Sequence, residues 1–163
     1  MKARMIGCAL LLSVLCGCNG KRLADDDLYN VQAGLAAGLP YPVLEWRAIT
    51  TVVDRGSEAG AGTTATLFGN DAAVEAARAV TSYPEGAVLG LVTWREREDP
   101  HWFGARIPGA VVSVEFVVVG ATTVCRRFEG TPLREVAGGG AARVAEIEGM
   151  KAAWMPQGGG SLR

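Results

Sequence analysis

The 163-residue chain is 49% hydrophobic and 20% charged, and its formal net charge is −1. This composition excludes disorder over most of the length and gives no reason to expect nucleic-acid binding. One compact domain is the natural expectation at this size.

The first residues predict an export signal with a lipid attachment site. Met1–Arg4 carries two positive charges, and Met5–Gly17 is uncharged and apolar. As a helix the second run would reach about 20 Å, against about 30 Å for the apolar core of a bilayer, so it suits a signal peptide better than a membrane span. Leu15-Cys16-Gly17-Cys18 resembles the lipobox of bacterial lipoproteins. We expect residues 1–17 to be removed and acyl chains on Cys18 to anchor the protein to a membrane.

The residues around Cys18 also bear on location and on redox chemistry. Asn19, and not aspartate, follows Cys18, which by resemblance to Gram-negative sorting rules indicates the periplasmic face of the outer membrane. The alternative is an ordinary signal peptide with incidental cysteines. With Cys8 and Cys16 removed and Cys18 acylated, Cys125 is the one thiol left, which excludes an intramolecular disulfide. No CxxC pair is present for zinc, redox exchange or c-type haem attachment.

The mature chain divides into a tether, a folded part and a tail. Residues 18–40 contain three aspartates, scattered Gly and Ala, and little apolar periodicity, which indicates a tether. The folded part is expected over residues 41–155, and residues 156–163 form a Gly-rich tail.

Residue patterns within the folded part predict strands joined by short loops. The expected strands are Val43–Val53, Thr63–Phe68, Ala87–Arg95, Ala110–Val119 and Thr122–Phe128. Asn70 or Asp71 caps a helix over Ala72–Val80, while Ala141–Met155 fits a strand or a helix. Gly90 indicates a bulge or a close approach by another group. Because no helices alternate with the strands, we expect an α+β fold, a mainly antiparallel sheet of about five strands with one helix packed on it.

Two candidate site residues come from the folded part. His101 is the only histidine and lies in a predicted loop, Glu96–Gly109, beside Trp102 and Phe103. Any histidine-dependent catalysis or haem ligation within one chain must use it, and a purely structural role is the alternative. Glu115 is the one carboxylate in an apolar strand. Its pKa would rise on burial and it could then act as a base, whereas exposure at a sheet edge would leave it inert. We expect no metal site.

Strand alternation makes two further predictions. Val114 and Phe116 should share one face and Glu115 should lie on the other. Cys125 and Arg127 should likewise share a face, with Arg126 opposite. Nearby positive charge would activate the Cys125 thiol, but a buried inert thiol is the alternative, because a reactive thiol would be oxidised outside the cytoplasm.

Several short motifs, in order, resemble the cytochrome P-460 family over residues 41–128. They are Trp46 before a Thr-rich strand, Leu67–Ala73 (LFGNDAA), Tyr83–Leu89 (YPEGAVL), and Gly109 leading into Ser113-Val114-Glu115. The resemblance implies a periplasmic or secreted, mostly antiparallel β domain that is often dimeric. Some members oxidise hydroxylamine at a c-type haem.

Three departures separate this chain from the haem-bearing members. They carry a CxxCH motif, whereas here Cys125 stands alone and no histidine follows it. They carry a lysine cross-linked to the porphyrin, and Leu91 falls near that position; no lysine occurs between Lys21 and Lys151. Their catalytic carboxylate falls near the strand that contains Glu115.

The leading interpretation is a lipid-anchored envelope protein with a cytochrome P-460-like domain over residues 41–155. It has no covalent haem and binds a small ligand or a protein partner without catalysis. One alternative is an oxidoreductase acting on a small hydroxylamine-like substrate, with non-covalent haem, His101 as axial ligand and Glu115 as base. Another is a structural envelope lipoprotein. The expected partners are the membrane, through Cys18, and a second copy of the chain in a homodimer.

Overall fold

The computed structural model describes residues 30–35, 38–57 and 60–153. The expected signal peptide, the lipidation site Cys18 and the tail at 156–163 lie outside these residues. None of the helices in the described part of the chain is long and apolar enough to cross a membrane.

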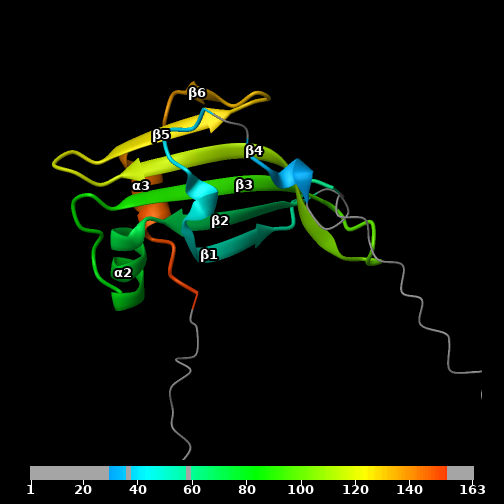
Figure 1. Cartoon of the computed structure of the whole chain (residues 1–163), viewed down its shortest axis with the longest axis horizontal. Coiled ribbons are helices and arrows are strands. Elements are labelled where there is room, and N and C mark those ends of the chain that lie inside the picture. Colours follow the sequence, from blue (N-terminus) through cyan, green and yellow to red (C-terminus); the bar gives the residue numbers. More distant parts are fainter. Residues whose placement is uncertain (1–29, 36–37, 58–59, 154–163) are drawn as a thin grey trace, which may run out of the picture.

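The domain is built on one sheet of six strands in sequential order, and each strand is antiparallel to the next (Figure 1). The strands are β1 (Arg47–Asp54), β2 (Thr63–Gly69), β3 (Val88–Glu98), β4 (Arg106–Val118), β5 (Val124–Glu129) and β6 (Arg134–Val136). The helices are α2 (Asp71–Ala79) and α3 (Ala141–Glu148), and two short 3-10 turns are η1 (Val31–Ala33) and η2 (Val43–Glu45). The predicted α+β class is confirmed, with one short strand and one helix more than expected.

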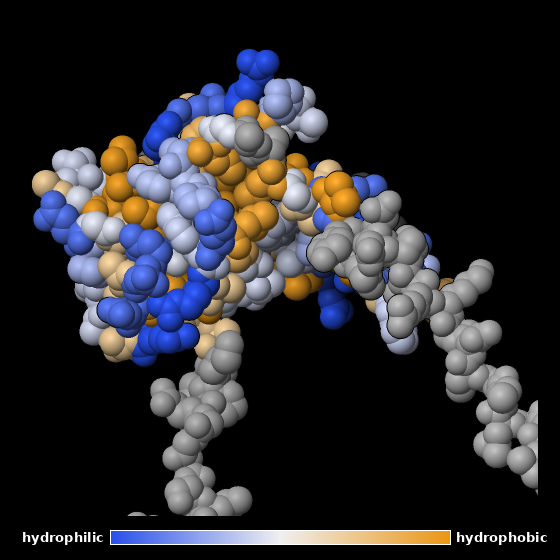
Figure 2. Space-filling model, in the orientation of Figure 1, coloured by the Kyte–Doolittle hydropathy of each residue, from blue (hydrophilic) through white to orange (hydrophobic). Residues whose placement is uncertain are grey.

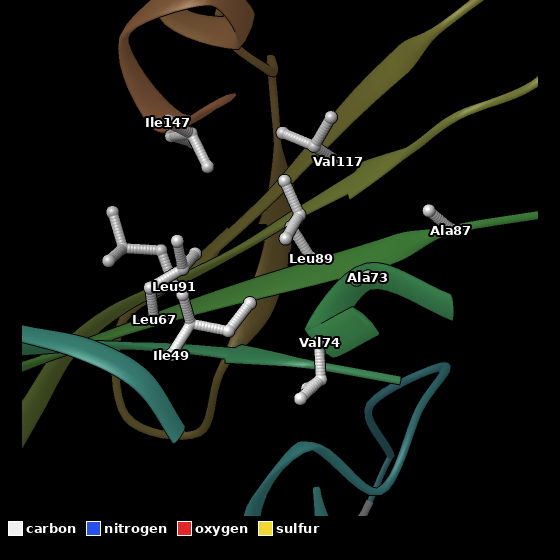
Figure 3. Close-up of a cluster of buried hydrophobic side chains, with 9 residues drawn as sticks. All are labelled: Ile49, Leu67, Ala73, Val74, Ala87, Leu89, Leu91, Val117 and Ile147. Carbon is white, nitrogen blue, oxygen red and sulfur yellow. The ribbon is translucent and has the colours of Figure 1, made fainter. Parts of the chain in front are cut away.

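The two faces of the sheet carry separate apolar clusters. On one face, α2 and α3 cover a cluster that includes Leu89, Leu91 and Val117 (Figure 3). On the other face, η2 and the chain before it cover a cluster that includes Val92, Val114 and Phe116. Figure 2 shows apolar side chains gathered over the face that bears η2. The predicted alternation along β4 is therefore confirmed.

Local signals explain the helix that joins β2 to β3. The Asn70 side chain accepts a hydrogen bond from Ala73 N at 3.1 Å and a second from Val88 N at 3.1 Å. Asn70 is thus the residue that caps α2, and it also ties the helix start to β3. The helix ends at Val80, which has a left-handed φ of 55°.

The close approach predicted at Gly90 is confirmed. A Cβ atom added there would collide with Cγ2 of Val43 and would lie 3.2 Å from Phe116. Val43 does not begin a strand, as the sequence suggested, because Val43–Glu45 forms η2 and β1 starts at Arg47. This turn directs Val43 into the core, where 1% of its surface is exposed.

The described part of the predicted tether packs on the sheet. The carbonyl oxygen of Ala33 accepts a hydrogen bond from Nε1 of Trp94 at 2.9 Å, and Leu35 and Leu39 contact the cluster around Phe116. The folded domain therefore begins upstream of Tyr41.

Half of the predicted loop Glu96–Gly109 is strand. β3 continues to Glu98, β4 begins at Arg106, and the two strands form a long hairpin arm at one end of the molecule (Figure 1). Only the tip between these two strands is a loop. The open prediction for Ala141–Met155 resolves as a helix, α3, which ends at Glu148.

Candidate functional site

Glu115 is buried and held by an arginine from α3. Only 1% of its side chain is exposed. Nη2 of Arg143 donates to Oε1 of Glu115 at 2.6 Å, and Nε of Arg143 donates to Oε2 at 3.0 Å. Nη1 of Arg127 lies 3.8 Å from Oε2 and adds a second positive charge. The hydrogen bonds to Glu115 hold the pKa of the Arg143 guanidinium well above its ordinary value.

This arrangement is that of a structural ion pair. Each carboxylate oxygen receives a charge-assisted hydrogen bond from the same planar guanidinium, the two-point geometry that arginine favours. Nη1 of Arg143 also lies 2.7 Å from Oε2 of Glu146, one turn along α3. The Glu115 carboxylate therefore faces protein donors instead of an open site, and its pairing fastens α3 to the sheet.

The surroundings of Glu115 are filled by apolar side chains. Leu91 is its partner in register on β3, and 1% of Leu91 is exposed. Ile147 of α3, which is fully buried, faces Leu89 and Leu91 (Figure 3). The space above this part of the sheet is thus occupied by α3.

His101 lies at the tip of the β3–β4 hairpin and away from Glu115. Its Nδ1 is 3.5 Å from Oδ1 of Asp99, and 39% of its side chain is exposed. The strand from Arg106 to Glu115 alone spans about 30 Å. The structure does not bring the two predicted site residues together.

Cys125 lies half-buried on β5 as a free thiol. It packs against the cluster beneath α3, and Arg127 reaches Glu115 on the same face. Arg126 instead lies over the ring of Phe128 at 5.4 Å and pairs with Glu135. The predicted division of these side chains between the two faces is therefore confirmed. Among the described residues, no three His, Cys, Asp or Glu side chains gather in a way that could hold a metal ion.

The fold is an α+β domain in which α2 and α3 cover one face of an antiparallel six-stranded sheet, and a buried ion pair joins α3 to that sheet. The family model for cytochrome P460 matches residues 43–126, more than half of the chain. The chain belongs to the cytochrome P460 family. No curated protein matches it.

The c-type haem that the family implies does not fit the residues found here. Covalent attachment needs a CxxCH motif, which the sequence lacks. Leu91 and Glu115, which the resemblance places near the family's cross-linking lysine and catalytic carboxylate, are partners in register on β3 and β4. Both lie beneath α3, and both are 1% exposed. A porphyrin beside them would have to displace Arg143 and Ile147.

Proposed function

We propose that this protein is a lipid-anchored cell-envelope member of the family that binds a small ligand or a protein partner without catalysis and without covalent haem. The observation that carries the proposal is the pairing of Glu115 with Arg143. A general base must be able to reach a substrate proton, whereas both oxygens of this carboxylate are engaged by the guanidinium.

The lipid anchor rests on the sequence Leu15-Cys16-Gly17-Cys18, and Asn19 supports sorting to the periplasmic face of the outer membrane. Radioactive palmitate supplied to expressing cells tests the anchor. Label should enter the wild-type chain and be lost from the Cys18→Ala variant. Equal labelling of the two proteins would reject the anchor.

An absorption spectrum tests the absence of bound haem. The full chain, purified from cells with a haem-replete periplasm, is expected to show no Soret band. A band that survives denaturation and extraction with acid and organic solvent would demonstrate covalent haem and refute the proposal. A band that is extracted, and that the His101→Ala substitution abolishes, would favour the non-covalent oxidoreductase. Even then, His101 and Glu115 could not act on one reacting centre, because the length of the hairpin arm separates them.

A further inference from the structure

The tip of the β3–β4 hairpin exposes two adjacent aromatic side chains. Trp102 is 72% exposed, and Phe103 is fully exposed. They lie at the far end of the arm, beyond the body of the sheet (Figure 1). Large aromatic side chains are costly to leave in water, and two at one protruding point indicate a contact with another surface.

The turn at the tip is held by hydrogen bonds within the loop. Asp99 N donates to the Ala105 oxygen at 3.0 Å, and Ala105 N donates to the Trp102 oxygen at 3.0 Å. Oδ1 of Asp99 accepts from His101 N at 2.8 Å. Gly104 supplies the left-handed φ of 77° that closes the turn. Three hydrogen bonds thus hold the turn within the loop, and Trp102 and Phe103 project from it into solvent.

The chain enters the domain beside this arm. Nδ2 of Asn30 donates to the Pro108 oxygen at 2.6 Å, and Oδ1 of Asn30 accepts from Nη2 of Arg97 at 3.2 Å. Pro108 lies about 7 Å along β4 from Arg106, where the tip begins. Between Cys18 and Asn30 the chain can span at most about 40 Å. An acylated Cys18 would therefore keep Asn30, and with it the base of the hairpin arm, within about 40 Å of the bilayer.

We infer that Trp102 and Phe103 insert into the interfacial layer of the phospholipid bilayer that holds the acylated Cys18. The inference rests on the proposed lipid anchor. Trp and Phe suit the boundary between headgroups and acyl chains, where an apolar ring can be buried while polar groups stay wet. Arg106 and Glu98 face each other at the base of the tip, and Asp99 adds a second carboxylate, so the tip suits zwitterionic headgroups better than anionic ones. The end that carries α2 then points away from the membrane (Figure 1).

Tryptophan quenching by brominated lipid tests the inference. The full lipidated protein is placed in phosphatidylcholine vesicles with either ordinary or brominated acyl chains. Brominated chains should lower the emission of the wild type, and Trp102→Phe should reduce that loss at least twofold. Trp46→Phe is the matched control, because Trp46 packs near Phe116 in the body of the domain, and the absolute loss of emission caused by brominated chains should be unchanged in this variant.

Flotation of the vesicles separates the two ways in which the experiment can fail. If the wild type does not float with the vesicles and takes up no palmitate, the anchor has failed and the inference fails with it. If the protein floats but Trp102→Phe is quenched as strongly as the wild type, the anchor stands and insertion of the tip is refuted. The exposed aromatics would then be assigned to a protein contact.

Discussion

Replacing Arg143 with Met should destabilise the domain more than any surface substitution, because it leaves the Glu115 carboxylate buried without its main partner. Removing one member of a buried ion pair costs about 3–5 kcal/mol. The side chain of Arg143 is 27% exposed, and Arg127 stays 3.8 Å from the carboxylate. Both facts favour the lower end of this range, so we expect the free energy of unfolding to fall by about 3 kcal/mol.

Equilibrium unfolding in urea measures this loss. With a slope of about 2 kcal/mol per molar urea, the midpoint should fall by about 1.5 M. The double variant Glu115→Leu/Arg143→Met should recover much of the loss, because it removes the buried charge together with its partner. Arg126→Met is the matched control: Arg126 makes a similar two-point pair with Glu135, but both side chains are more than a third exposed.

The reasoning would be refuted if Arg143→Met and Arg126→Met unfolded at the same urea concentration. It would also be refuted if the double variant were less stable than Arg143→Met alone. In either case the pair between β4 and α3 would not be what fastens the helix to the sheet.

Three further substitutions test other parts of the structure. Asn70→Ala removes the cap of α2 and should lower the free energy of unfolding by about 1–2 kcal/mol in the same urea assay. Gly90→Ala forces a methyl group against Val43 and should cost about 1–3 kcal/mol, whereas Gly120→Ala, where an added Cβ would make an ordinary contact of 3.6 Å with the Thr122 oxygen, should change stability by less than about 0.5 kcal/mol. Burial raises the pKa of Tyr83 above 10.0, so its contribution to stability is complete below pH 10 and is lost as the pH rises through the raised value. The stability of Tyr83→Phe should therefore fall less steeply than that of the wild type in urea titrations above pH 10.

The sequence predicted best those features that neighbouring residues determine. Alternation along β4 predicts Glu115 and Phe116 on opposite faces of the sheet. In the structure Glu115 pairs with Arg143 on one face, and Phe116 packs in the apolar cluster on the other. The sequence predicts Asn70 or Asp71 as a helix cap, and Asn70 is the residue that caps α2. It predicts a bulge or a close approach at Gly90, and the structure shows the close approach. Each of these inferences depends on local periodicity or on the chemistry of a single residue.

The hairpin arm was missed for a physical reason. Its residues alternate in charge between Arg95 and Asp99, and such a stretch resembles a solvated loop. The arm extends past α2 and α3, and the segment around Asn30 packs on it through polar hydrogen bonds, so it carries little apolar periodicity, although its two strands are hydrogen-bonded to each other. The distance between His101 and Glu115 follows from this arm and could not be predicted without it.

The partner of Glu115 could not be found from local patterns either. The sequence allows Glu115 to be either buried or exposed. Its burial depends on the ion pair with Arg143, which follows β5, β6 and a Gly-rich connection along the chain. The available signal was indirect. A carboxylate buried in an apolar strand needs a cation as its partner, and Arg143 lies in the segment Ala141–Met155, which by its sequence fits a strand or a helix.

The same pair links the stability of the domain to the proposed loss of catalysis. Leu91 lies near the position that the family resemblance assigns to a lysine, and it is the partner of Glu115 in register. At this point β3 therefore provides no cation beside Glu115. A carboxylate buried there must take its positive partner from another element, and α3 provides it through Arg143. Docking Arg143 in turn brings Ile147 over Leu91 and closes the face. Arg143 therefore both pairs the buried carboxylate and keeps α3 over Leu91, and its removal would leave Glu115 without its main partner.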